Sequence, residues 1–323
     1  MKPAGKVVVS AGLVALLVWQ LGGIEDVVAA VRRLDPRHAL AVVLAHWLDR
    51  ALMTFKWTLL LARRGIRLPL YRGLTIYCAS MIWGTLLPTS VGADAARIVS
   101  TSRLGISVKE VVASIAIERA IGSLAACALA LASVAVLTAR LGLGAEVHAL
   151  WLATGAAVLL VTGLFVASFS KIGFDLLHQR LLARVVGAHI AGRLRAMHEA
   201  YQTYGRTRGG LLVFGALTLA EQLLCLGIIW GIAHGLGIAL TAMDVLATAP
   251  LIFLMSRLPI TVDGVGLTEW TFVAVMSLTG VPPAEAVAIA VVGRVVQVLA
   301  WSPWAMAHAL GTRRVNPSTG VTA

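Results

Sequence analysis

The stretch SRLPITVDGVGLTEW, residues 256–270, interrupts a chain that otherwise has the character of lipid-embedded helices. It places a proline, two glycines and three charged residues between two apolar segments. Proline and glycine both disfavour the interior of a helix. Non-helical backbone at membrane depth is tolerated only where it is buried in protein or lines a water-filled cavity. The interruption is therefore the first candidate for a functional site.

The composition predicts a single all-α membrane domain over residues 1–323. Hydrophobic residues make up 59% of the chain and charged residues only 13%. A helix needs roughly 20 apolar residues to cross a hydrocarbon core of about 30 Å. We take the first apolar run as an uncleaved anchor, because no small-residue cleavage site follows it directly. Spanning helices are predicted near 6–22, 38–62, 109–138, 149–169, 210–234 and 284–310.

The formal net charge of +12 does not indicate nucleic-acid binding, because the basic residues lie in particular loops. Four arginines follow the second predicted span, and 171–208 is also basic, whereas the loops at 139–148 and 235–243 contain only Arg140. This asymmetry follows the positive-inside rule. It predicts both termini in the cytoplasm of a bacterial-type inner membrane, although the basic loop 23–37 departs from the pattern.

The opening stretch has a counterpart in the first half of the chain. LLPTSVGADAAR at 86–97 and RLPITVDGVG at 257–266 share Leu-Pro, then Ser or Thr, Val, Gly and an acidic residue. After each, GISVKEVVASIAIER at 105–119 aligns without gaps on GVPPAEAVAIAVVGR at 280–294. Glycine, glutamate and arginine in common register predict an internal duplication, with repeat cores at 38–138 and 210–310.

Both breaks are flanked by apolar pieces that are too short to span. These are 73–87 and 98–108 around Pro88, and 241–256 and 267–279 around Pro259. Two re-entrant hairpins that enter from opposite sides explain the loop charges and predict an inverted repeat, as in secondary transporters. The alternative for 241–279 is two short, tilted spans. In either arrangement Gly92, Gly264 and Gly266 belong to the breaks.

Ionisable residues inside spans require an explanation, because each costs about 3 kcal/mol or more unless it is paired or hydrated. His46, Asp49, Arg50 and Met53 form one polar stripe at helical spacing. Mutual pairing that locks helices together is one explanation for the charges, and binding of a guest is the other. Guanidinium groups match phosphate in a bidentate way, which favours a lipid phosphate. The candidate binding residues are Asp94, Arg97, Glu118, Arg119, Arg257, Asp263, Glu269 and Arg294.

Residues 171–208 are different in kind. Apolar residues recur there every three to five positions among arginines, which predicts a basic amphipathic helix on the cytoplasmic surface or a solvated connector between the halves. Elsewhere the chain has no H-x-x-x-H pair, Walker sequence or G-x-S-x-G motif, so we predict no metal, no cofactor and no catalytic residue. A membrane-embedded enzyme acting on a lipid phosphate or polyprenyl-linked sugar is the alternative function, and a purely structural membrane partner is a third.

At these motifs the sequence resembles the transmembrane region of the lysylphosphatidylglycerol synthase family, also called the flippase-like domain family. The family pattern Pro-x-x-x-Gly-Gly-Asp-x-x-Arg is matched by Asp94 and Arg97, although Ala93 follows Gly92. In its second pattern, Leu-Pro-x-x-Pro-Gly-Gly-x-Gly-x-x-Glu, Val262 and Asp263 replace Pro-Gly. The remaining matches are Pro259, Gly264, Gly266, Glu269, the Glu118-Arg119 pair, and Gly280 through Arg294.

The resemblance implies movement of a phospholipid or lipid-linked headgroup across the membrane. In the fused synthases of the family, a cytosolic domain attaches lysine to phosphatidylglycerol and the membrane domain moves the product. Only nine residues follow Arg314, so the lysyl-transfer activity is not expected here. The expected partner is a membrane phospholipid with an anionic or aminoacylated headgroup. The sequence identifies neither the lipid nor a coupling ion, and it leaves homo-oligomerisation open.

Overall fold

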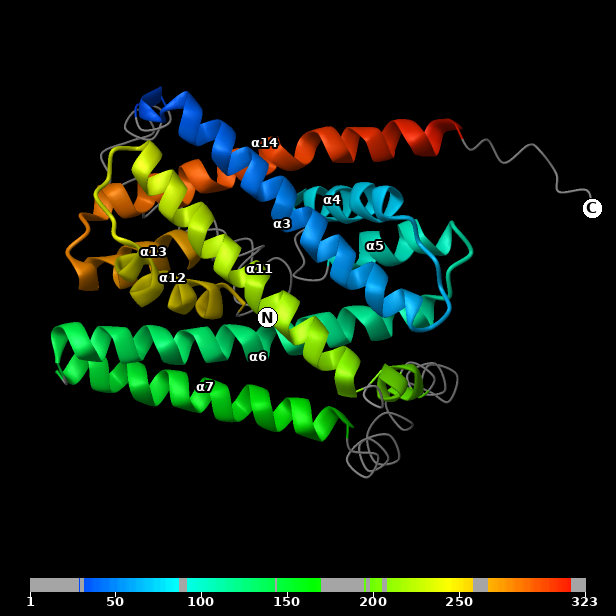
Figure 1. The fold of residues 1–323 in the computed structure, drawn as a ribbon, viewed down its shortest axis with the longest axis horizontal. Helices are drawn as coiled ribbons and strands as arrows, with labels where there is room; N and C mark the ends of the chain where they lie inside the picture. Colours follow the sequence, from blue (N-terminus) through cyan, green and yellow to red (C-terminus); the bar gives the residue numbers. More distant parts are fainter. Residues whose placement is uncertain are drawn as a thin grey trace, which may run out of the picture.

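The protein is all-helical in a computed structural model (Figure 1). The structure describes residues 32–86, 92–142, 144–169, 198–204, 208–257 and 267–314, together with Ala29 and Arg195. These residues contain no strand. The predicted anchor at 6–22, most of the predicted connector at 171–208, and Pro88, Pro259, Asp263, Gly264 and Gly266 lie outside the described residues.

Two series of four helices follow one another, and α7 lies between them in the sequence. The first series is α3 (Pro36–Ala62), α4 (Leu70–Leu86), α5 (Gly92–Ser102) and α6 (Val108–Leu141), followed by α7 (Ala145–Phe169). The second is α11 (Arg208–Gly235), α12 (Ala242–Ser256), α13 (Leu267–Met276) and α14 (Pro283–Arg314), with a 3-10 turn at Ser277–Thr279. Each series runs long, short, short, long.

Five predicted spans correspond to long helices, but two predictions need correction. The second short piece of the first half was predicted at 98–108, whereas α5 begins at Gly92 and ends at Ser102. Hydropathy placed this helix too late, because its first turns contain the charged residues Asp94 and Arg97. Both are buried in α5, where they form an ion pair. The second correction concerns α3. It has 27 residues but does not qualify as a span by hydropathy, since its charged residues are buried inside the protein.

Equivalent glycines end helices in both series. Gly65, Gly105, Gly237 and Gly280 all have φ between 74° and 81°, a left-handed conformation that glycine adopts without steric cost. In each case the N–H of the next residue donates to the carbonyl five positions earlier, as in Ile66 to Leu61 and Val281 to Met276. In each series one such turn follows the long first helix, and a second follows the pair of short helices. The local structure thus supports the alignment of Gly105 with Gly280.

The packing of the two series is also equivalent. α4 packs on α14, and its counterpart α12 packs on α6. α3 contacts α4, α6 and α14, while α11 contacts α12, α14 and α6. The same packing pairs are obtained when the helices of the two series are exchanged, that is, α3, α4, α5 and α6 with α11, α12, α13 and α14 in that order. The two series are therefore arranged around each other in a nearly symmetric way.

Helices α3 and α11 meet at the centre of this arrangement and run antiparallel (Figure 1). The backbone N–H of Asp35, before α3, donates to the carbonyl of Gly235 at the end of α11 at 2.9 Å. Further along, Lys56 of α3 bonds to Thr218 and Glu221 of α11. α3 and α11 thus point in opposite directions. The pairs α4–α5 and α12–α13 lie at opposite ends of the molecule (Figure 1).

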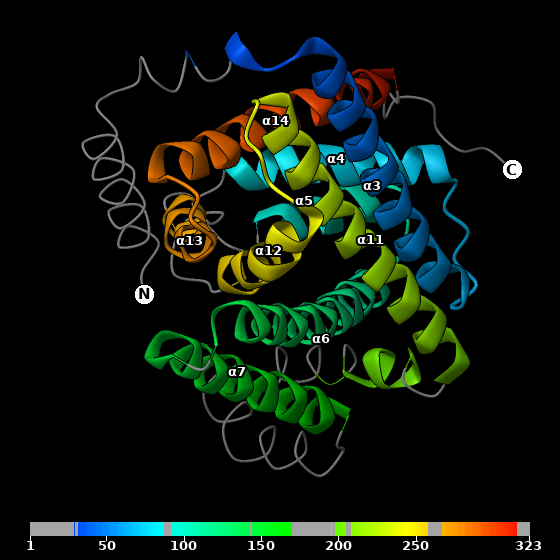
Figure 2. The ribbon, with the colours of Figure 1, turned by 60° about the vertical axis from the view of Figure 1, so that its left-hand side comes forward.

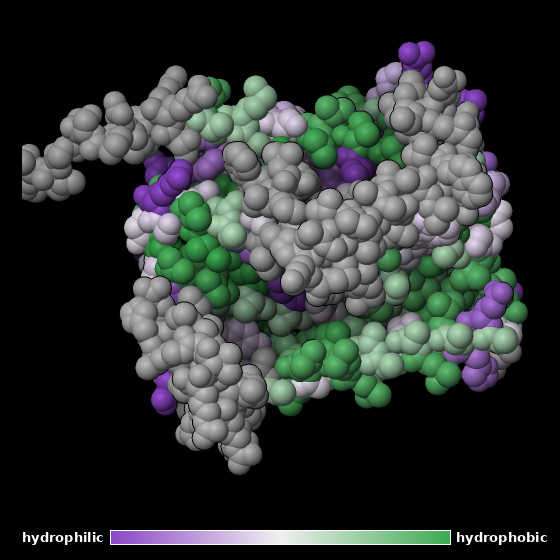
Figure 3. All heavy atoms as spheres, turned by 180° about the vertical axis from the view of Figure 1, so that it is seen from behind, coloured by the Kyte–Doolittle hydropathy of each residue, from purple (hydrophilic) through white to green (hydrophobic). Residues whose placement is uncertain are grey.

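The outer surface has the character of a membrane protein. Helices α6, α7, α11 and α14 are long and apolar enough to cross a bilayer. α7 packs principally on α6 and stands outside the other helices (Figure 2), so that Leu152, Leu159 and Leu164 are exposed. Most hydrophilic residues gather towards the two ends of the face in Figure 3, with apolar residues between them. The chain is therefore an all-α integral membrane protein.

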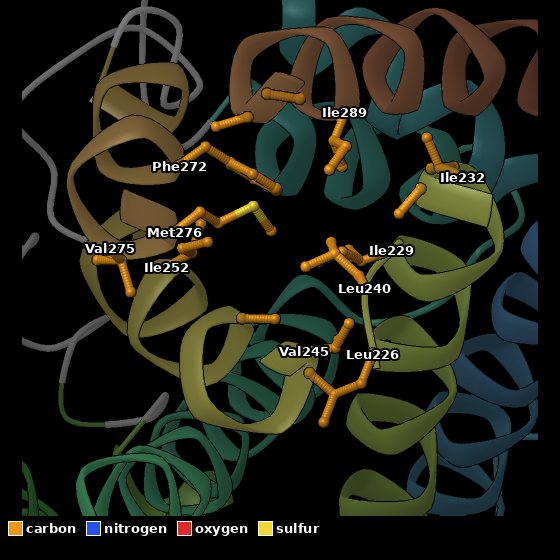
Figure 4. Packing of buried hydrophobic residues seen from close by; sticks show 14 of the residues in the cluster. Leu226, Ile229, Ile232, Leu240, Val245, Ile252, Phe272, Val275, Met276 and Ile289 are labelled. Atoms are coloured by element: carbon orange, nitrogen blue, oxygen red, sulfur yellow. The ribbon is translucent and has the colours of Figure 1, made fainter. Parts of the chain in front are cut away.

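The main apolar core lies mostly in the second series. Leu226 and Ile229 of α11, Ile252 of α12, Met276 of α13 and Ile289 of α14 contribute to one cluster (Figure 4). Methionine fills irregular gaps between such helices, and Met276 is fully buried. The first series has a smaller apolar cluster, which includes Trp57 and Leu61 of α3, Ile76 of α4, and Val111 and Ile115 of α6.

The exposed start of α12 carries a capping box and an ion pair to α6. The Thr241 hydroxyl accepts from the Asp244 N–H, the Asp244 carboxylate accepts from the Thr241 N–H at 2.8 Å, and Arg140 pairs with Asp244. Burial opposes ionisation of Asp244, but the hydrogen bonds from Thr241 and Arg140 outweigh it, so the pKa of this carboxyl is lowered.

We expect Asp244→Ala to destabilise the protein by about 1–2 kcal/mol, because it removes half of the capping box and the partner of Arg140. Because the pKa of Asp244 is lowered, its contribution is complete above the usual aspartate pKa of about 4 and is lost as the pH falls through the lowered value. Thermal unfolding in detergent at several pH values measures both effects. Glu146→Ala, at the exposed start of α7, is the matched control. Equal losses in the two variants would contradict this assignment.

Candidate functional site

A buried polar network joins α4, α5 and α6. Arg97 is 1% exposed, with its guanidinium over the rings of Trp57 and Tyr77 at 5.0 and 4.7 Å. It donates to Glu118 at 3.0 Å and to Asp94 at 3.3 Å. The Tyr77 hydroxyl donates to the other Glu118 oxygen at 2.6 Å. Arg97 Nε is buried without a partner among the described residues, but the remaining bonds join α5 to α4 and α6.

Arg119 extends the network towards solvent. Its Nε donates to Asp94 at 2.7 Å, yet 55% of its side chain is exposed. Asp94 therefore lies between two arginines, of which Arg97 is enclosed and Arg119 is accessible. Arg119 lies eleven residues into α6, or roughly 16 Å from the start of that helix. An accessible guanidinium at this depth requires water or an anionic group beside it.

The second series repeats one of these pairs and lacks the other. Arg294 of α14 donates to Glu269 of α13 at 3.1 Å, and the two residues are 25 positions apart, as are Arg119 and Asp94. In the same register Phe272 and Gly293 stand opposite Arg97 and Glu118. Both members of the Arg97–Glu118 pair are thus absent together, as expected because one buried charge without its partner is strongly unfavourable.

A second group of charges lies where α3 meets α11, and we call it the α3–α11 cluster: Asp49, Arg50, Lys56, Glu221 and Cys225. Arg50 donates from Nε to Asp49 at 2.7 Å, and Lys56 donates to Glu221 at 2.9 Å. The Cys225 thiol lies 3.6 Å from Asp49. Asp49 and Lys56 are each 1% exposed. The predicted polar stripe of α3 is therefore turned towards neighbouring helices.

A third feature, which we call the Gly122 site, consists of Arg119, Gly122, Gln222 and Arg257. Gln222 of α11 donates to the Gly122 carbonyl at 2.9 Å, and its own carbonyl oxygen is buried without a partner in the described part of the chain. A Cβ on Gly122 would lie 3.4 Å from the Arg257 guanidinium. The guanidinium of Arg257, at the end of α12, thus lies against α6.

Arg257 is the most available cation of this site. Its side chain is exposed, although protein atoms surround its guanidinium on most sides. Among the described residues it forms no hydrogen bond or ion pair, and the charges that act on it include those of Glu221 and Arg119. Guanidinium donors that bind none of the described residues suit an anionic guest.

Asp49, Glu221 and Cys225 are the described residues best placed to share an ion, with donor atoms within 4.8 Å of one another. Arg50 and Lys56 already neutralise the two carboxylates, so a divalent cation would have to displace a resident charge. The donor set therefore does not favour a metal, because the α3–α11 cluster as a whole already has no net charge.

The structure places the predicted site residues in separate groups. Asp94, Arg97, Glu118 and Arg119 meet in one network, Arg257 lies beside the same face of α6, and Glu269 with Arg294 forms a separate pair. Gly92 is the buried first residue of α5. Sequence reasoning missed Trp57, Tyr77, Gly122 and Gln222. Of these four residues, only Gly122 was indicated by the sequence, because it lies one turn after Arg119.

These features define an all-α integral membrane protein whose two similar helical series enclose buried charges. The chain belongs to the family of the lysylphosphatidylglycerol synthase transmembrane region, whose model matches residues 4–304. Membership connects the protein with the handling of membrane phospholipids. No curated protein matches the chain significantly.

Proposed function

We propose that the protein is a lipid flippase or scramblase that moves a phospholipid or lipid-linked headgroup across the inner membrane. The observation that carries this proposal is the recessed but exposed Arg257 beside Arg119, within a molecule whose outer helices are apolar. Such a site suits a guest whose phosphate needs guanidinium donors and whose acyl chains stay in lipid. Family membership supports the same class of substrate.

In this proposal the two series form an inverted repeat. The antiparallel contact of α3 with α11 and the exchangeable packing of the series support a two-fold axis in the membrane plane. The pairs α4–α5 and α12–α13 then act as re-entrant hairpins from opposite sides. The basic connection after α3 lies at the end where α6 begins (Figure 1), and we assign this end, with both termini, to the cytoplasm.

The candidate residues take different roles. Arg119 and Arg257 bind the headgroup phosphate, and the unpartnered Gln222 carbonyl accepts from a headgroup amine or hydroxyl. Arg97 and Glu118 are enclosed and position α5, while Glu269 and Arg294 do the same for α13. Asp94 orients Arg119. An anionic or aminoacylated phospholipid fits this arrangement.

Translocation of fluorescent lipids in proteoliposomes, read by dithionite quenching, tests the proposal. We expect the wild type to move anionic or aminoacylated lipids faster than protein-free vesicles do, and Glu269→Gln to slow this movement. Arg103→Ala, which removes an exposed arginine between α5 and α6, is the matched control. Folded protein that moves no lipid, or that converts the lipid into a new product, would contradict a flippase and favour an enzyme.

A further inference from the structure

The α3–α11 cluster lies on the contact between equivalent helices of the two series. Lys56 and Glu221 join α3 to α11 there, and Thr218 accepts from the same ammonium group at 3.2 Å. Any rearrangement of the two series against each other must change this contact. Helices can be held together by apolar packing, so charges at the contact are not needed for adhesion.

The two carboxylates of the cluster keep unused acceptor capacity. Asp49 Oδ2 accepts from Arg50, and Glu221 Oε2 accepts from Lys56. Their other oxygens point to the Cys225 sulfur, which lies 3.6 Å from Asp49 Oδ1 and 4.0 Å from Glu221 Oε1. A thiol is a weak donor, so these oxygens are poorly satisfied. A proton is the smallest cation that these oxygens can accept.

The two cations are not equivalent. Arg50 is held by two hydrogen bonds to Asp49 and lies over the rings of Tyr77 and Trp301 at 5.7 and 4.9 Å. Arginine stays charged in proteins. Lys56 is a single ammonium on a flexible stem, and its other neighbour is the Phe214 ring at 5.4 Å. Lys56 is therefore the cation that can be released.

His46 adds a further buried polar group to the same stripe of α3. It lies one turn before Asp49 and Arg50, is 7% exposed, and packs edge-on against Trp301. Its Nε2 is buried without a hydrogen-bond partner among the described residues. The polar stripe thus continues beyond the cluster along α3.

Charged groups from every neighbouring helix bear on this cluster. α6 contributes Glu118, which acts on Lys56, and α12 contributes Arg257, which acts on Glu221. α4 contributes Tyr77, beside Arg50. α14 contributes the Trp301 ring, while its Arg294 is bound to Glu269.

We propose that the α3–α11 cluster is a proton site that couples lipid movement to the proton gradient, with Glu221 as the group that takes up the proton. This inference rests on the proposed function. Protonation turns the Glu221 carboxylate into a neutral acid, breaks its ion pair with Lys56 and gives the cluster one uncompensated positive charge. The α3–α11 contact then rearranges, and the proton leaves Glu221 towards the opposite side. No other reactant is required.

Proton binding is tested first without lipid transport. Infrared spectra of the full chain in detergent, recorded at acid and at alkaline pH, should show a carboxylic acid band that appears on acidification and that Glu221→Gln removes. Because that variant leaves Lys56 without its partner, Lys56→Met/Glu221→Gln, which keeps the cluster neutral, is the second variant. A spectrum without such a band, or a band that persists in both folded variants, would overturn the proton site.

Coupling is tested in proteoliposomes that hold a pH-sensitive dye and fluorescent phosphatidylglycerol. For one proton per lipid, a gradient of one pH unit should shift the steady-state lipid distribution about tenfold in the wild type. Lys56→Met/Glu221→Gln should abolish this shift and retain movement down the lipid gradient. Equal shifts in both proteins, or a shift that follows sodium and not protons, would refute the coupling. If the infrared band titrates but no lipid moves, the proton site stands and the proposed function fails.

Discussion

Arg97→Ala is expected to destabilise the protein by about 3–5 kcal/mol, the largest loss among single substitutions in the polar network. The substitution leaves the largely enclosed Glu118 carboxylate with the Tyr77 hydroxyl as its only hydrogen-bond donor among the described residues. It also removes the cation between the rings of Trp57 and Tyr77. Unfolding of purified protein by heat or by a denaturing detergent measures the effect.

The matched control is Arg97→Met/Glu118→Gln, which removes both charges and keeps an acceptor for Tyr77. Replacing both members of a buried pair is far less costly than removing one. The second series, with Phe272 and Gly293 in the aligned positions, shows that helices of this kind pack without the pair. We therefore expect the double variant to regain at least half of the lost stability. Equal losses in the single and double variants would show that packing, and not charge, explains the effect.

Arg257→Ala is expected to reduce the initial rate of lipid translocation about tenfold to a hundredfold, with little change in stability. A hydrogen bond to a charged group contributes about 1.5–3 kcal/mol, which corresponds to this range. The Arg257 side chain has no ion-pair partner among the described residues, so we expect its removal to leave no charge of that part of the chain unpaired. The dithionite assay with phosphatidylglycerol measures the rate. Arg257→Lys should retain part of it, since an ammonium group gives charge without bidentate geometry.

Gly122 provides an independent check on the same site. A Cβ at this position would lie in ordinary contact with the Arg257 guanidinium, so Gly122→Ala should stay close to the wild-type rate. Gly122→Ile should displace the guanidinium and approach the rate of Arg257→Ala. Identical rates for the alanine and isoleucine variants would place the headgroup elsewhere.

Hydropathy was sufficient to predict the long apolar helices α6, α7, α11 and α14. Runs such as 109–138 and 210–234 are apolar enough to be recognised locally, and α6 and α11 confirm them. The alignment of Gly105 with Gly280 was also visible in the sequence. Both glycines end a helix with the same local hydrogen bonds. Only α5 was placed too late, since its buried residues are charged.

The partners of the charged residues were not predictable. Glu118 and Arg119 are adjacent in sequence, yet successive residues of a helix point about 100° apart. Glu118 consequently faces Arg97 and Tyr77, while Arg119 faces Asp94. Lys56 and Glu221 are 165 positions apart and meet only through the packing of α3 on α11. Tertiary arrangement, which no local pattern encodes, selects these partners.

The most direct test of the account is the water accessibility of position 257 inside the membrane. We would introduce Arg257→Cys in a background in which Cys78, Cys127 and Cys225 are replaced by alanine, and add a membrane-impermeant maleimide to proteoliposomes. The account predicts that the thiol reacts and that an anionic phospholipid slows the reaction, whereas Leu159→Cys on the lipid-facing α7 stays unlabelled. A cysteine at 257 that reacts no faster than the one at 159 would contradict a headgroup site between the two series.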